Sequence, residues 1–138
     1  MEYFAEANNF YEAAESLQLG GDPLTSSLIL MQHAKCLMYS GDFEKAALYA
    51  CAAVQRREEE GVETEDLLQG LDECASILLS CGRADDCLRY LEEEIALLMG
   101  KNDVARARIP AHTLVELWAD NLNEVERQTL RVGEWIED

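Results

Sequence analysis

Two stretches of the chain decide the fold, because they repeat one pattern. Residues 34–54 read AKCLMYSGDFEKAALYACAAV, and residues 75–95 read ASILLSCGRADDCLRYLEEEI. Superposing the central glycines, Gly41 and Gly82, aligns small residues with small ones and apolar residues with apolar ones. The aligned pairs are Ala34 with Ala75, Leu37 with Leu78, Ala46 with Cys87, Tyr49 with Tyr90, and Val54 with Ile95. Each stretch is therefore predicted to form two helices joined by a turn at its glycine.

Working outward, apolar residues at steps of three and four mark six helical stretches. The first carries a predicted inward stripe of Tyr3, Ala7, Phe10, Ala14 and Leu17. Asp22 and Pro23 are predicted to begin the second helix, as its N-cap and its first-turn residue. The second, third, fourth and fifth helices are predicted to end at Gly41, Gly61, Gly82 and Gly100. Pro110 is predicted to start the last helix after a polar loop. Its predicted stripe is Leu114, Trp118, Leu122, Val125, Val132 and Ile136.

The charge of the chain excludes some partners. The 28 Asp and Glu against 11 Lys and Arg give a net charge of −17. Residues 62–100 are the most acidic third, with ten acidic and two basic side chains. Such a surface repels nucleic-acid phosphates and anionic membranes, so we expect neither as a partner. A basic protein partner would be attracted, although acidic helix faces that simply keep the chain soluble explain the charge equally well.

The cysteines bear on the compartment. Cys36, Cys51, Cys74, Cys81 and Cys87 are odd in number and lie inside helical patterns beside Ala or Leu. We expect reduced, mostly buried thiols. No apolar run with a basic start is present, so no signal peptide or membrane span is predicted. The expected location is the cytoplasm or the nucleus.

Residues that carry catalysis are scarce. His33 and Cys36 lie one helical turn apart, but no second ligand pair completes a metal site, and a structural histidine is the preferred interpretation. Neighbouring carboxylates at 58–60 and 92–94 splay around a helix, so both runs are interpreted as solvated faces. We predict no enzyme activity, catalytic residue, metal or cofactor.

The repeated pattern resembles the tetratricopeptide repeat, a pair of antiparallel helices with a small residue at their crossing. The family's small residue, turn glycine, aromatic residue and alanines correspond to Ala34, Gly41, Phe43, Ala46 and Ala53. In the second copy, Ala84 replaces the aromatic residue and Glu94 replaces the later alanine. The glycines are 41 residues apart, against 34 in the family, which implies longer helices and a divergent relative.

The resemblance implies an all-α domain over 1–138, in which antiparallel helix pairs stack as a short right-handed superhelix with a long C-terminal helix. The first helix would occupy 1–21, the clearest repeat 22–61 and the second repeat 62–100. A loop and a capping or interaction helix would fill 101–138.

The family's groove positions predict a partner-binding surface. They correspond to Met31, Lys35, Met38, Tyr39, Asp72, Ser76 and Leu79. We reject a carboxylate clamp of the kind the family uses, because the corresponding positions hold Met31, Lys35 and Glu73, and only Lys35 is a cation. The expected function is a scaffold or adaptor that binds a peptide or helix of another protein, basic or amphipathic in character. Three alternatives stay open: a structural subunit of a larger assembly, binding through the last helix around Trp118 and Trp135, and Met31 and Met38 as core residues that face the neighbouring helix. The sequence leaves the oligomeric state open.

Overall fold

A computed structural model describes the backbone of residues 2–17 and 22–137, and the side chains of 6–15, 22 and 24–120. Within these ranges the chain forms six α-helices and no strand. The helices are α1 (Glu2–Leu17), α2 (Pro23–Tyr39), α3 (Phe43–Glu60), α4 (Thr64–Ser80), α5 (Ala84–Gly100) and α6 (Val104–Glu137). The predicted all-α class, with a long last helix, is confirmed.

The turns between successive helices from α2 onward share one construction. Gly41, Gly61, Gly82 and Asn102 all adopt a left-handed conformation, with φ between 58° and 90°. At the first of these turns, the Asp42 amide donates to the Leu37 carbonyl at 2.9 Å and the Gly41 amide to the Met38 carbonyl at 3.1 Å. These bonds satisfy carbonyls that the end of the helix leaves unpaired, and they hold the next helix antiparallel.

The structure has a period of 41 residues. Helix α2 spans 23–39 and α4 spans 64–80, so each bound is shifted by the same amount. The left-handed turn residues at 41 and 82, and at 61 and 102, keep the same spacing. The helices of the two pairs are 17 or 18 residues long. The 41-residue spacing of Gly41 and Gly82 in the sequence is therefore also the spacing of the two helix pairs.

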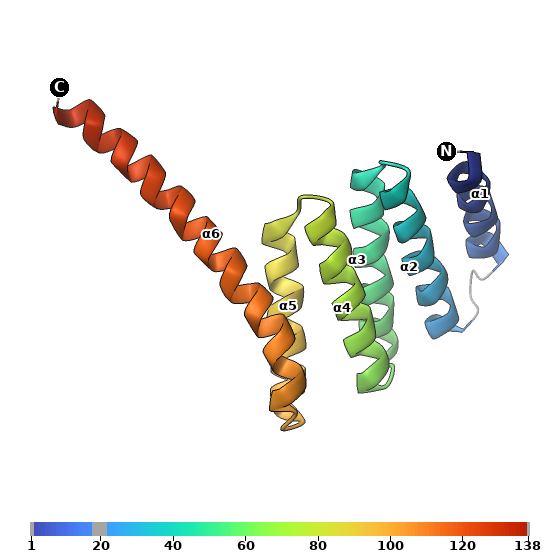
Figure 1. Ribbon diagram of the computed structural model, residues 1–138. Coiled ribbons are helices and arrows are strands. Elements are labelled where there is room, and N and C mark those ends of the chain that lie inside the picture. Colours follow the sequence, from blue (N-terminus) through green and yellow to red (C-terminus); the bar gives the residue numbers. More distant parts are fainter. Residues whose placement is uncertain (1, 18–21, 138) are drawn as a thin grey trace.

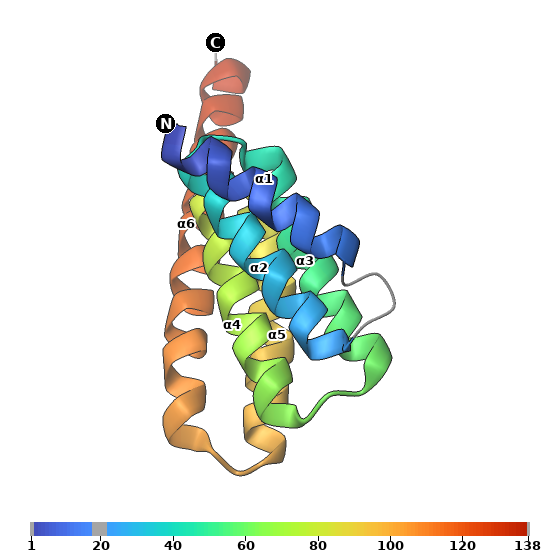
Figure 2. The ribbon, with the colours of Figure 1, turned by 90° about the vertical axis from the view of Figure 1, so that its right-hand side faces the viewer.

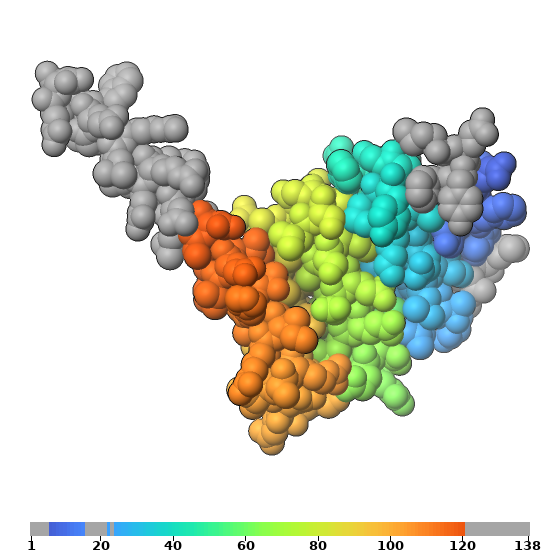
Figure 3. Space-filling view, viewed as in Figure 1, coloured from blue at the N-terminus to red at the C-terminus, as the bar shows by residue number. Residues whose placement is uncertain are grey.

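The helices stand side by side in chain order (Figure 1). Seen along the row, α2, α4 and α6 lie in one layer and α3 and α5 in the other (Figure 2). Besides the contacts between sequence neighbours, α2 contacts α4 directly. The layer of α2, α4 and α6 forms the face seen in the space-filling view (Figure 3).

Small residues let the helices approach closely. Ala34, Ala46 and Ala75 are buried in the core, as predicted. A larger side chain at such a crossing would hold the two helices apart. Of the five cysteines, all free thiols, Cys74 and Cys87 are buried and the other three are half-buried. The core thus runs continuously through α2, α3, α4 and α5 and reaches Leu114 of α6.

A buried aromatic cluster fixes α1. His33 is buried, and its Nδ1 lies 2.6 Å from Oε1 of Glu15. The ring stacks on Tyr11 and meets Tyr49 edge-on, which confirms a structural role for the histidine. The predicted inward stripe of α1 was wrong at Phe10, which is 76% exposed. Tyr11 faces the core instead, because α1 is rotated to bring Tyr11 over His33.

Helix α6 begins earlier than predicted. It starts at Val104 rather than at Pro110, because Asp103 Oδ1 accepts from the Arg106 amide at 3.2 Å and caps it. Pro110 lies inside the helix and lacks the amide that would bond to the fourth residue before it. Leu114 is buried as predicted, whereas Trp118 is partly exposed. The side chains predicted beyond Trp118 lie outside the described residues.

Helix α6 is twice as long as the helix against which it packs. It has 34 residues, whereas α5 has 17. At 1.5 Å per residue the lengths are roughly 50 and 25 Å. Accordingly, α6 runs past α5 and away from the other helices (Figure 1).

Candidate functional site

A groove of about 310 Å³ lies between α2 and α4. Five of the predicted partner-binding residues line it: Lys35, Met38, Tyr39, Asp72 and Ser76. Helical spacing explains this convergence, since Lys35 and Tyr39 are one turn apart on α2 and Asp72 and Ser76 are one turn apart on α4. The packing of α2 against α4 brings the two rows together.

Two of the predicted residues lie elsewhere. Met31 is fully buried in the core, so its inclusion in the surface was wrong. The side chain lies one turn before Lys35 on α2, where the neighbouring helices close over it. Leu79 is partly exposed but does not line the groove. Of the predicted residues on α2, Lys35, Met38 and Tyr39 therefore line the groove, whereas Met31 lies in the core.

The groove combines an apolar floor with charged walls. Ile77 is buried and Met38 half-buried beneath it, while Tyr39 is 65% exposed at its edge. Lys35 Nζ lies 3.4 Å from Oε2 of Glu73, an ion pair that ties α2 to α4. With Asp72 also in the lining, the groove holds two carboxylates against one ammonium group.

Sequence reasoning did not assign three of the lining residues to the binding surface. They are Glu73, Ile77 and Ser80. Glu73 and Ser80 lie three and four residues from the predicted Ser76, and Ile77 lies four residues after Glu73. Extending the predicted residues of α4 by helical spacing would therefore have found all three.

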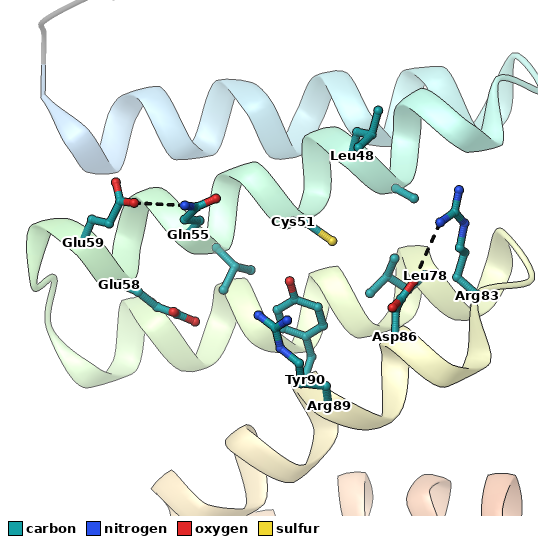
Figure 4. A pocket seen from close by; sticks show the side chains of 12 residues that line it. Leu48, Cys51, Gln55, Glu58, Glu59, Leu78, Arg83, Asp86, Arg89 and Tyr90 are labelled. Atoms are coloured by element: carbon teal, nitrogen blue, oxygen red, sulfur yellow. Dashed lines mark hydrogen bonds and ion pairs between the residues drawn. The ribbon is translucent and has the colours of Figure 1, made fainter.

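A larger cleft of about 610 Å³ lies on the other layer, between α3 and α5 (Figure 4). Its polar side chains include Gln55, Glu58 and Glu59 of α3, Arg83 just before α5, and Asp86 and Arg89 of α5. The Arg83 and Asp86 side chains form an ion pair at 3.8 Å, and Gln55 donates to Glu59 at 3.0 Å. The polar groups of these two pairs are thus used within the wall of the cleft.

Cys51 is the thiol in this cleft, where it lies beside Tyr90 (Figure 4). The Cys74 thiol hydrogen-bonds to it and, with a smaller contribution from the Tyr90 hydroxyl, lowers the Cys51 pKa; partial burial opposes this effect. Burial and the neighbouring Cys51 raise the pKa of Tyr90. Among the cysteines whose pKa is shifted, Cys51 is the one whose pKa is lowered, so its thiol is the most readily ionised of them.

Neither a metal-binding cluster nor a membrane-spanning helix is found among the described residues. In the part of the chain that the structure describes, no group of three or more His, Cys, Asp and Glu side chains is arranged to hold a metal ion. Over the same residues, no helix has the length and apolar character that crossing a membrane requires.

Comparison with models of protein families found no match for the chain, and searches of curated proteins and of solved structures found none either. The resemblance to the tetratricopeptide repeat therefore rests on the residues of this chain.

Proposed function

We propose that the chain is a protein-interaction module whose helices stack as a tetratricopeptide-like right-handed superhelix. A peptide or helix of another protein, basic and amphipathic, would bind in the groove between α2 and α4. Stacked helix pairs of this kind expose an extended surface along one layer, and amphipathic helices bind such grooves through apolar side chains.

One observation carries the proposal: five residues selected from the sequence pattern line a single groove. The groove has features that such a partner needs. Tyr39 and Met38 offer apolar contact, and methionine adapts to different partners. Asp72 and Glu73 favour a basic partner, as does the net charge of −17. The proposal includes no catalytic activity.

The proposal is tested by selecting peptides from a random display library against the purified protein. Selected sequences should combine Lys or Arg with apolar residues at helical spacing. They should bind at least tenfold more weakly to Tyr39→Ala, because buried apolar contacts contribute most to affinity. The control is Phe10→Ala, which removes an exposed aromatic side chain from α1. Selected peptides that bind equally to both variants would contradict the groove.

Kinetics separate the apolar from the charged contribution. Tyr39→Ala should speed dissociation, whereas Asp72→Lys should slow association, chiefly at low salt. Glu92→Lys makes the same charge change on an exposed part of α5 and is the matched control. An Asp72→Lys effect no larger than that of Glu92→Lys would reduce the role of Asp72 to net charge alone.

A second function has one observation in its favour. Helix α6 exposes Val104, Val115 and Trp118, apolar residues whose helical spacing places them on one face. A structural subunit would cover this face with helices of its assembly. The mass in solution distinguishes the two functions: a soluble monomer favours the adaptor, and a protein that is insoluble without its partner favours the subunit.

A further inference from the structure

A second cavity opens between α4, α5 and α6, with a volume of about 510 Å³. Its lining includes four carboxylates: Glu65, Asp66, Asp72 and Glu94. Asp72 lines both this cavity and the groove between α2 and α4, so the two sites meet at α4.

Glu94 is the unusual member of this set. The residue is only 6% exposed, and its Oε2 has no hydrogen-bond partner among the described residues. Burial, and then the charge and hydrogen bond of Asp72, raise the Glu94 pKa to about 7. A buried carboxylate is normally paired with a cation or hydrogen-bonded at both oxygens, because its desolvation is costly. Glu94 instead faces another carboxylate.

The cations around the cavity are used elsewhere. Arg106 of α6 lines the cavity, but its Nη1 lies 3.0 Å from Glu65 and 3.7 Å from Asp103. Lys101 also binds Glu65. The charge of Arg106 lowers the Glu94 pKa only as the smallest of the contributions. The charged groups in the lining are therefore Glu65, Asp66 and Asp72 of α4, Glu94 of α5 and Arg106 of α6, and Asp72 is the one that hydrogen-bonds to Glu94.

The repeat shows that the packing of the helices does not demand these carboxylates. At the positions 41 residues earlier, Met31 corresponds to Asp72 and Ala53 to Glu94. Both Met31 and Ala53 are fully buried in the core. The second helix pair thus carries two carboxylates where the first carries apolar side chains, and the cavity lies there.

We propose that this cavity binds a basic side chain of the partner peptide, lysine or arginine, between Asp72 and Glu94. The peptide would run from the groove across α4, with its apolar residues in the groove and its cation in the cavity. In this form the inference rests on the proposed function, while the cation site itself can be tested alone. Binding keeps Glu94 ionised, so below about pH 7 it releases the Glu94 proton to solvent.

The first experiment uses a synthetic amphipathic peptide of leucine and glutamine whose one basic residue is a central arginine, and its twin with neutral citrulline in that place. Calorimetry on the wild-type protein at about pH 8 should give at least tenfold tighter binding of the arginine peptide, about 1.4 kcal/mol or more. Glu94→Gln should remove that preference, and Glu92→Gln should keep it. Equal binding of both peptides by the wild type, or a preference retained by Glu94→Gln, would overturn the proposal.

Proton release supplies a readout that a structural role of Glu94 would not move. The preference for arginine should shrink in the wild type between about pH 8 and about pH 5.5, as Glu94 takes up its proton, and should show no such change in Glu94→Gln. A preference that is constant over this range would contradict a cation held by Glu94.

A second experiment separates the cation site from the groove. Methylguanidinium is titrated into the wild-type protein while the ¹³C resonance of the Glu94 carboxyl is followed by NMR, and its pKa should fall. If neither peptide binds but methylguanidinium lowers this pKa, the cation site stands and the proposed groove function fails. If the peptides bind and methylguanidinium has no effect, the groove stands and the cation site fails.

Discussion

The two helix pairs, α2–α3 and α4–α5, follow one backbone plan yet bury charge in different ways. In the first pair Arg57 is 1% exposed, and its Nε donates to Ser27 Oγ at 2.7 Å. Its Nη1 donates to the carbonyl of Asp66 on α4. In the second pair, Leu98 and Leu68 occupy the corresponding positions and are buried against each other in a small apolar cluster.

Gly70 completes the arrangement around Arg57. A side chain at this position on α4 would meet the arginine, since a Cβ there would lie 3.0 Å from Arg57 Cδ. Two of the three guanidinium nitrogens of Arg57 thus bond to groups of the chain, Nε and Nη1, while Nη2 is buried without a hydrogen-bond partner among the described residues. The second pair buries Glu94 beside Asp72 without a cation. The turns and the small residues are alike in the two helix pairs, whereas the charged residues buried where the helices pack are different.

The largest effect is expected from breaking the charged contact of the first pair. Arg57→Ala should lower the free energy of unfolding by roughly 3–5 kcal/mol, because it leaves Ser27 and the Asp66 carbonyl without their donor and opens a void against Gly70. Urea denaturation measures the change. Arg108→Ala, on an exposed part of α6, should change stability by no more than about 0.5 kcal/mol. Equal effects of the two changes would contradict a structural role for Arg57.

A smaller effect tests the crossing that both pairs share. Ala46→Leu should overpack the contact of α2 with α3 and cost on the order of 1–3 kcal/mol. Ala46→Cys, which installs the residue of the second pair, should cost less. Thermal denaturation compares these variants with Ala96→Leu, an exposed position on α5 that should tolerate leucine. A parent-like melting temperature for Ala46→Leu would mean that the crossing is misassigned.

A stability effect of similar size or smaller concerns the second pair and depends on pH. The Glu94 pKa is about 7 in the folded protein, against 4.5 ordinarily, so the folded state holds the proton more tightly. Glu94 therefore lowers stability progressively as the pH rises from about 4.5 through about 7. Glu94→Gln should be more stable than the wild type above pH 7, by on the order of 1–3 kcal/mol, and similar to it near pH 4. Urea denaturation at both pH values checks this, and a pH-independent difference would contradict the raised pKa.

The sequence predicts the features that depend on local spacing. Glycine positions locate three of the left-handed turns, and the period of the apolar residues gives the six helices. The alignment of the two stretches also identifies Ala34, Ala46 and Ala75 as crossing residues. Five of the seven predicted groove residues converge, because the register of each helix fixes its own row and the packing of α2 against α4 brings the two rows together.

The features that depend on neighbouring helices could not be predicted. Helical spacing shows which residues share a face, but the depth of burial depends on what packs there. Met31 was therefore placed on a surface, although the structure buries it. Residues 92–94 were interpreted as a solvated face, yet Glu92 is exposed, Glu93 half-buried and Glu94 buried. The burial of the three residues differs because Glu94 alone lines the cavity between α4, α5 and α6. The run of glutamates in the sequence does not show this.

The most direct measurement is the pKa of the Glu94 carboxyl in the free wild-type protein, followed by ¹³C NMR during a pH titration. The account predicts a value near 7, since Glu94 is buried beside Asp72 without a cation. Asp72→Asn should lower this value only in part, because burial is the larger cause. An ordinary value near 4.5 would mean that Glu94 is solvated or already paired within the chain, and would contradict an unfilled cation site in the second helix pair.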